Sequence, residues 1–283
     1  MTEVQEVILE IFKVVADICE RHQIPYFAIG GTCLGAVRHH GFIPWDDDLD
    51  IAIPIQHFDR FWEIADKELP AKYQTYTHKK VKVYNKPFGK IHNIETAYIE
   101  TKELDFKDSY KGIFVDIMPI SAIPDQPEER EEFYRQVRRY KKLNYTRRYP
   151  ISLMNSNRRK RKWVLMRALG PFIKYDHYSE KLLDLMRSHP FGSTSLTGYT
   201  WSKNIRKFTF PVEYFETTVD LPFEDTTIKC PVKYGEYLKA QFGENYMEVP
   251  PEESRWYHKT ELVDTHKSYK EYAKETGTEK ETL

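Results

Sequence analysis

Residues 30–54 read GGTCLGAVRHHGFIPWDDDLDIAIP and combine a Gly pair, a short helix-like run and a dense group of carboxylates. The last two carboxylates, Asp48 and Asp50, run directly into an apolar stretch. Residues two positions apart on a strand point to the same face of a sheet. We therefore expect a strand over residues 48–53 from which both carboxylates project together, while the apolar residues beside them face a core.

Two carboxylates this close repel each other unless a cation lies between them. Hard oxygen ligands suit Mg²⁺ or Mn²⁺, which proteins usually share with a substrate phosphate. The spacing of Asp48 and Asp50 therefore predicts two metal ligands that are also catalytic residues. The preceding Asp47 is interpreted as a supporting residue behind these ligands. Whether one or two metal ions bind stays open at this point.

The Gly pair predicts a phosphate-binding turn. The apolar run over residues 25–29 reads as a strand, Gly30 and Gly31 follow it, and Thr32 is a favourable residue for capping a short helix. A helix N-terminus presents backbone N–H groups to an anion, and glycine lets a phosphate approach the backbone closely. We expect these three residues to bind a phosphate.

A third carboxylate, Asp116, lies inside a second apolar strand expected over residues 111–118. An ionisable residue in such a strand costs free energy unless it is paired or binds a metal. If the two acidic strands are neighbours, Asp116 completes a cluster of three, in which it either bridges the metal or accepts a proton from a hydroxyl group. Lys90 and Arg38 are two further candidates for contact with the phosphates.

Hydrophobic periodicity outlines a mixed sheet flanked by helices. Helices are expected over residues 3–22, 55–68, 127–149, 158–170, 176–188 and 233–241, and short strand-like runs over residues 81–84, 88–91 and 97–99. The expected organisation is a catalytic core over residues 1–125, a helical basic segment over 126–190, a C-terminal part packed on the core over 191–266, and a frayed polar tail over 267–283.

The central motif, Gly30 to Ile51, resembles the signature of the LicD family, which comprises choline-phosphate transferases with a nucleotidyltransferase-type fold related to the fukutin group. Two further stretches resemble that family: Gly112–Pro119, and a C-terminal series of motifs from Cys230 to Pro251. The resemblance runs in order over roughly residues 5–260. One departure is Phe242, where the family more often has Tyr before the Gly.

The resemblance implies an α/β (α+β) nucleotidyltransferase-like fold. It also implies transfer of phosphocholine from CDP-choline to a sugar hydroxyl of a cell-surface glycan precursor, of teichoic acid or lipopolysaccharide type. The acceptor is expected to be lipid-linked. Three alternatives stay open: a transferase that uses CDP-ribitol or CDP-glycerol, a nucleotidyltransferase that joins an NTP to a sugar, and a membrane-associated binding protein without activity.

Composition favours a folded globular protein, with 40% hydrophobic residues, 14% aromatic residues and zero formal net charge over 283 residues. No apolar stretch approaches the ~20 residues that span a bilayer, and the N-terminus lacks the features of a signal peptide. Three cysteines without metal-ligand spacing read as reduced thiols. These features predict a cytoplasmic location.

One segment has a strong local charge bias. Residues 135–174 contain fourteen Lys or Arg and no Asp or Glu, and aromatic and aliphatic residues follow the run at 158–162. Such a segment binds an anionic membrane surface or another polyanion, or is a solvated helix face. We expect peripheral contact with the inner face of a membrane. No nucleic-acid recognition motif is present, and no P-loop, dinucleotide-binding, zinc-protease or serine-hydrolase motif either.

Overall fold

The computed structural model describes residues 1–81, 84, 86–101, 109–148, 164, 176–200, 202, 204–255 and 257–275. Its centre is a mixed sheet in the order β1-β2-β6-β4-β3, which β7 and β8 extend from the far end of β6. β2 runs parallel to β6, whereas β1–β2 and β4–β6 are antiparallel. The strands are β1 (Phe27–Ala28), β2 (Asp50–Pro54), β3 (Tyr73–Tyr76), β4 (Gly89–Asn93), β6 (Phe114–Ile123), β7 (Leu196–Gly198) and β8 (Thr209–Pro211).

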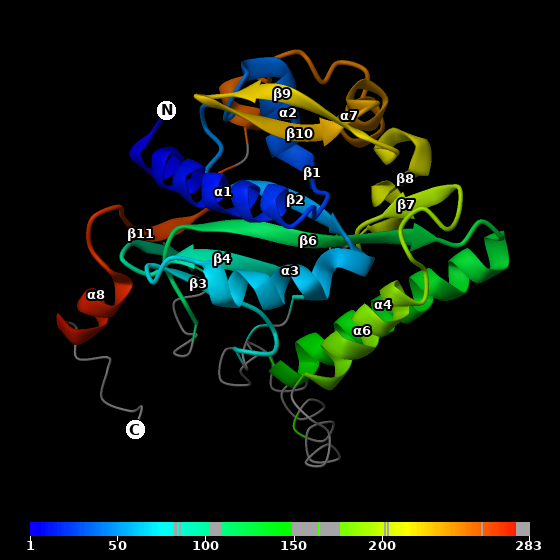
Figure 1. Ribbon diagram of the computed structural model, residues 1–283, viewed down its shortest axis with the longest axis horizontal. Coiled ribbons are helices and arrows are strands. Elements are labelled where there is room, and N and C mark those ends of the chain that lie inside the picture. The colour runs from blue at the N-terminus through cyan, green and yellow to red at the C-terminus, as the bar shows by residue number, and fades with distance from the viewer. Residues whose placement is uncertain are drawn as a thin grey trace.

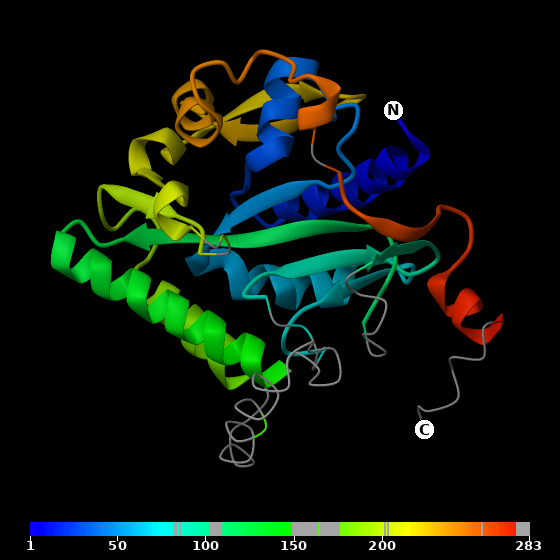
Figure 2. The same ribbon diagram turned by 180° about the vertical axis from the view of Figure 1, so that it is seen from behind.

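Two amphipathic helices, α1 (Glu3–Arg21) and α3 (Ile55–Glu68), cover one face of this sheet (Figure 1). Both match the helices predicted from the sequence. Thr2 caps α1 through a reciprocal pair of hydrogen bonds with Gln5, in which the two side-chain oxygens accept from the backbone N–H groups of Gln5 and Thr2. Viewed from behind, β2, β6 and β4 lie in front of these helices (Figure 2). The predicted mixed sheet flanked by helices is confirmed.

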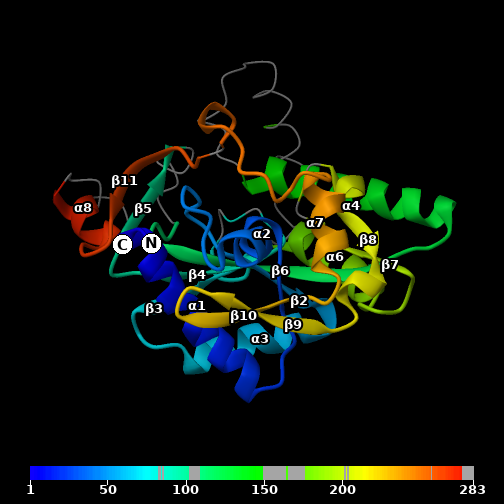
Figure 3. The same cartoon turned by 90° about the horizontal axis from the view of Figure 1, so that it is seen from above.

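A second layer lies above the sheet and combines one helix from the first part of the chain with elements that follow residue 217. It holds α2 (Gly30–His39), the hairpin β9 (Thr218–Phe223) and β10 (Thr226–Pro231), and α7 (Tyr234–Phe242). Viewed from above, α2 lies across the middle of β6, with α7 beside it (Figure 3). Short 3₁₀ turns over Ile205–Phe208, Val212–Phe215 and Glu252–Ser254 connect this layer to the rest of the chain.

The helical segment contains α4 (Pro127–Arg148) and α6 (His177–Arg187), which pack against each other at one end of the sheet (Figure 1). A small hydrophobic core joins this pair to the end of β6, through Ile123, Phe133, Val137 and Leu182. The predicted helix over 158–170 lies outside the described residues except for Val164, and so do parts of the predicted strand over 81–84.

The C-terminal segment crosses back to the opposite end of the sheet, where β11 (Thr260–Asp264) pairs with β5 (Ala97–Glu100) (Figure 2). α8 (Tyr269–Glu275) follows β11, so the prediction of a frayed tail from residue 267 is wrong for the residues up to 275. The Ser268 hydroxyl donates to the Ile94 carbonyl and Tyr269 N–H donates to the Thr96 carbonyl, which holds this turn against the core.

Candidate active site

The strand register places three ionisable side chains in a row across the sheet. Asp116 on β6 is the register partner of Asp50 on β2 and of Lys90 on β4. Register partners point to the same face, and the residues that follow the two acids, Ile51 and Ile117, are fully buried on the other face. The predicted neighbouring acidic strands are therefore present. The regular strand begins at Asp50, two residues later than predicted.

The glycine-led turn lies against this row of side chains. The Ile29 N–H donates to the Asp50 carbonyl at 3.2 Å, and Gly30 follows with a φ of 58° that favours glycine. A Cβ on Gly30 would lie 3.7 Å from Asp50 Oδ2, and one on Gly31 would lie 2.5 Å from Asp46 Oδ2. The two carboxylates therefore lie directly beside the start of α2.

The residues predicted to bind phosphate differ from the expected geometry in detail. α2 begins at Gly30, so Thr32 is inside its first turn and does not cap it. Thr32 Oγ1 instead accepts a hydrogen bond from the Asp50 N–H at 2.8 Å, which fastens α2 to β2. The Gly30 N–H donates to the Tyr237 hydroxyl at 2.8 Å. The N–H groups of Gly31 and Thr32 belong to the first turn and have no partner within the helix.

Burial and mutual repulsion govern the protonation of the acids. Burial, followed by the charge of Asp50, raises the pKa of Asp46 to about 7. Burial, followed by neighbouring carboxylates, also raises the pKa values of Asp48 and Asp50 well above the usual range, and the charge of Asp116 contributes to both shifts. In the metal-free protein, this cluster therefore opposes its own ionisation.

The chemistry of these donors fits a divalent cation. Asp50 Oδ1 is buried and has no hydrogen-bond partner among the residues that the structure describes. Carboxylate oxygens are the ligands that Mg²⁺ and Mn²⁺ prefer, and a cation would remove the repulsion that raises these pKa values. As the side chains stand, no three His, Cys, Asp or Glu residues of the described chain form a group that could hold an ion. The metal roles of Asp48, Asp50 and Asp116 stay predictions.

Lys90 lies beside an acid of the cluster. Its Nζ is 2.9 Å from Asp116 Oδ1 and rests over the ring of Phe114. Both side chains are almost completely buried. The positive charge of Lys90 therefore offsets part of the negative charge of the carboxylates. The sequence suggested Lys90 as a partner for a diphosphate, and this structure shows its contact with Asp116.

Arg38 lies at the other end of α2 from the acids, about 12 Å along the helix from Gly30. Its guanidinium donates to the backbone carbonyls of Tyr246 and Glu248, at 2.9 and 3.0 Å. Arg38 thus holds the segment that follows α7 against α2. The structure does not bring Arg38 together with the acids, and its predicted phosphate contact stays a prediction.

Asp47 makes contacts that the sequence did not reveal. One of its carboxylate oxygens accepts from the hydroxyl of Tyr98 on β5, and the other accepts from Nδ1 of His258 at 2.5 Å. The supporting role predicted for Asp47 stays a prediction. His258 was missed because it is 211 residues away in sequence, and only the pairing of β11 with β5 carries it to the acids.

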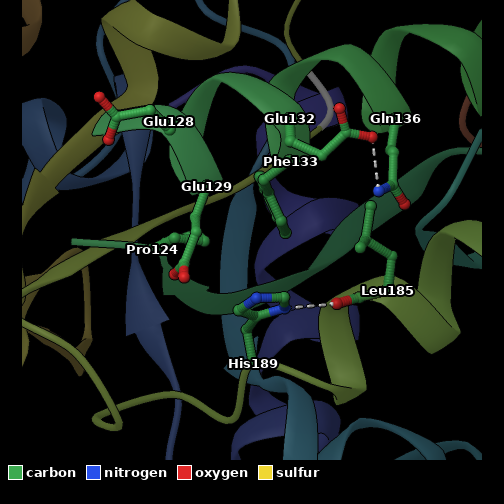
Figure 4. Close-up of a pocket in the computed structure, with 8 residues that line it drawn as sticks. All are labelled: Pro124, Glu128, Glu129, Glu132, Phe133, Gln136, Leu185 and His189. Atoms are coloured by element: carbon green, nitrogen blue, oxygen red, sulfur yellow. Dashed lines mark hydrogen bonds between the residues drawn. The ribbon is translucent and has the colours of Figure 1, made fainter. Parts of the chain in front are cut away.

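A separate hollow of about 420 Å³ lies between the start of α4 and the end of α6 (Figure 4). Glu128, Glu129, Glu132, Phe133 and His189 are among its lining residues. It opens beyond the far end of β6, about 25 Å along that strand from Asp116. Three glutamates disfavour a phosphate ligand, so this hollow does not compete with the acidic cluster as a site for a phosphate donor.

A mixed sheet with carboxylates on adjacent strands, facing the glycine-led start of a short helix, defines a nucleotidyltransferase-type transferase domain. Comparison with protein families supports this class, because the model described as "LicD/FKTN/FKRP, nucleotidyltransferase domain" matches residues 23–157. Residues 23–157 therefore match the LicD family model, as the sequence motifs predicted.

The relatives extend the similarity beyond this domain. Lipopolysaccharide cholinephosphotransferase LicD of Haemophilus influenzae is 28% identical over 261 residues, which cover 90% of this chain and 94% of that protein. Uncharacterized proteins of Rickettsia prowazekii and Rickettsia typhi are each 48% identical over 44 residues, or 16% of this chain. The first similarity includes most of the C-terminal part, which contributes His258 and Tyr237 to the site.

Proposed function

We propose that this protein is a metal-dependent transferase that moves phosphocholine from CDP-choline to a sugar hydroxyl of a cell-surface glycan precursor. The observation that carries the proposal is the register pairing of Asp50 with Asp116 beside the start of α2, with Asp48 two residues before Asp50. The family match and the activity for which the Haemophilus relative is named support phosphocholine as the transferred group and a glycan as the acceptor. The finer assignment to CDP-choline rests on the resemblance alone.

The proposed reaction forms one P–O bond and breaks another. The acceptor hydroxyl oxygen attacks the phosphorus atom that carries choline, the bond from that phosphorus to the CMP oxygen breaks, and CMP leaves. The hydroxyl proton passes to a carboxylate of the cluster. Mg²⁺ or Mn²⁺, held by Asp48, Asp50 and Asp116, would neutralise the diphosphate and the leaving CMP. The N–H groups of Gly31 and Thr32, which have no partner within the helix, orient the donor phosphates.

The acceptor is proposed to be lipid-linked and to be reached at the inner face of a membrane. Basic side chains along α4 support this location, although Lys141 donates to the carbonyls of Thr200 and Ser202 and so contributes little to an outer surface. The run at 158–162 lies outside the described residues. Among the helices of the described chain, none has the length and apolar character needed to cross a bilayer.

Nucleotide release tests the proposed reaction. The protein is incubated with Mg²⁺ and a glycan-lipid extract, together with CDP-choline, CDP-ribitol, CDP-glycerol or CTP plus a sugar phosphate. We expect CMP release with CDP-choline, and phosphocholine incorporated into the glycan fraction. Faster CMP release from another CDP-alcohol would replace the donor, and pyrophosphate release from CTP would replace the reaction. Failure of all four, with no thermal stabilisation by any nucleotide, would favour the binding-protein alternative.

Gly31→Ala tests how closely transfer depends on the position of Asp46. The new Cβ would lie 2.5 Å from Asp46 Oδ2, so this carboxylate must move away from the start of α2. A displacement of this size lowers catalysis by about 10- to 100-fold. We expect kcat/KM to fall in this range, while the free energy of unfolding changes by less than about 1 kcal/mol.

Gly235→Ala is the matched control, because the nearest atom to a Cβ there is the Tyr246 hydroxyl oxygen at 3.7 Å. It should leave both quantities near the wild-type values. Wild-type activity in Gly31→Ala would show that the position of Asp46 is unimportant.

A further inference from the structure

The segment that follows α7 is fixed on both sides of His258. On one side, the Arg255 guanidinium lies over the ring of Trp45 at 4.2 Å, and its Nε donates to the Pro250 carbonyl. On the other side, β11 pairs with β5 in antiparallel register, and the Thr101 N–H donates to the Lys259 carbonyl at 2.9 Å. These contacts fix the backbone on both sides of His258 and so hold its side chain beside the acids.

The two ring nitrogens of His258 face different carboxylates. Nδ1 lies 2.5 Å from Asp47 Oδ1, and because an ionised carboxylate only accepts, this nitrogen carries the hydrogen. Nε2 is turned toward Asp48 and lies 3.7 Å from its Oδ2. That distance is too long for a hydrogen bond. Nε2 therefore faces a predicted metal ligand at the distance of an ion pair, not of a hydrogen bond.

We propose that His258 is a nitrogen ligand of the metal ion that Asp48 and Asp50 hold, which makes the site a mixed nitrogen and oxygen site. The inference rests on the metal site of the proposed function and adds a residue that lies outside the matched family domain, residues 23–157. Asp47 and Tyr98 then act as positioning residues, because they fix the ring of His258.

The contacts of His258 are those of a metal-binding imidazole. A histidine that binds a metal through one nitrogen almost always donates its other N–H to a carboxylate or a carbonyl. Here the Asp47 carboxylate takes that role, and Tyr98 in turn donates to the second oxygen of Asp47. The remaining nitrogen points at Asp48, as expected of two groups that share an ion.

A nitrogen ligand changes which ions the site prefers. Imidazole suits Zn²⁺, Co²⁺ and other transition metals, whereas carboxylates and water suit Mg²⁺. With His258 in place, we expect Mn²⁺ and Co²⁺ to bind more tightly than Mg²⁺. In a site made of carboxylates alone, the affinities for these ions would differ less.

His258→Asn separates the ligand role from the structural role. The Asn amide nitrogen can replace Nδ1 in the bond to Asp47, but nothing replaces Nε2. Calorimetric titration of the full chain with MnCl₂, CoCl₂ or MgCl₂, without nucleotide, gives the affinities. We expect the Kd for Mn²⁺ and Co²⁺ to rise at least about tenfold, and the Kd for Mg²⁺ to change by less than about threefold. The visible absorption of the Co²⁺-loaded protein should also change.

His22→Asn is the matched control, because His22 also contacts a carboxylate, Glu68, at 2.8 Å but lies away from the site. It should leave every affinity unchanged. His258→Gln, which returns a polar atom near the position of Nε2, should recover part of the Co²⁺ affinity. Circular dichroism and melting temperature verify that each variant is folded.

Two results would overturn the inference. Unchanged Mn²⁺ affinity with an unchanged Co²⁺ spectrum in His258→Asn would exclude the nitrogen ligand. An equal rise in affinity for all three ions would show that His258 only offsets the charge of the acids. Either result leaves the proposed transferase intact, because that proposal fails instead when Asp50→Asn retains both metal binding and transfer.

Discussion

Asp50→Asn is expected to lower the rate of transfer by at least about 10²- to 10³-fold and, at the same time, to stabilise the metal-free protein. The loss of transfer follows because Asp50 lies beside Gly30 in the row with Asp116 and supplies a buried oxygen without a partner. Stabilisation follows because the amide has the shape of the carboxylate but removes a charge that its neighbours repel.

The pH dependence of stability has a definite sign. The folded-state pKa values of Asp46, Asp48 and Asp50 are raised above the unfolded value of about 4. The metal-free folded state therefore binds more protons than the unfolded chain, and stability falls as pH rises above about 4. For Asp46, this loss extends to about pH 7. Asp50→Asn should flatten the profile above pH 4.

Thermal unfolding with and without MgCl₂ measures these effects. The wild-type melting temperature should rise on addition of Mg²⁺, whereas the metal-free Asp50→Asn variant should melt about 2–4 °C above the metal-free wild type and respond weakly to Mg²⁺. Asp225→Asn is the control, because Asp225 is exposed and pairs with Lys13. Turnover at the wild-type rate in Asp50→Asn would remove this residue from the site.

Lys90→Met should produce the largest loss of stability, about 3–5 kcal/mol in the free energy of unfolding. Lys90 is the ion-pair partner of Asp116, and both side chains are buried between neighbouring strands. Methionine fills a similar volume but leaves the carboxylate buried without its cation. Added Mg²⁺ should recover part of the loss, because it supplies positive charge at the same cluster.

A double-variant cycle identifies the cause of this loss. Lys90→Met combined with Asp116→Asn should recover most of the stability, since neither charge then remains. Lys13→Met, which breaks an exposed ion pair with Asp225, should cost less than about 1 kcal/mol in denaturant unfolding. Equal losses in the single and double variants would show that Lys90 acts through packing alone.

Much of the fold was predictable because its signals are local. The apolar periodicity of α1 and α3 gave bounds close to those observed, and the strands that bear Asp50 and Asp116 are neighbours as expected. The spacing of apolar residues along a helix, and an acid within an apolar strand, are both set by residues that are close in sequence. The sequence pattern alone therefore predicts these elements.

The parts of the site that were missed depend on distant residues. Thr32 has the chemistry of a helix cap, but because β2 lies beside α2, its hydroxyl oxygen instead accepts a hydrogen bond from the Asp50 N–H. Gly30 donates to Tyr237, which is 207 residues away. No local pattern encodes such contacts, because they exist only after the sheet register and the packing of α7 are set.

The pairing of β11 with β5 has a consequence for protein synthesis. β5 emerges from the ribosome long before residues 260–264, so the edge of this strand has no β11 partner until the intervening residues have been made. Domains generally fold from the N-terminus as they are made. The nascent sheet can therefore assemble its acids early, but His258 reaches Asp47 only after β11 has been made and has paired with β5, so this contact forms later than the acid cluster.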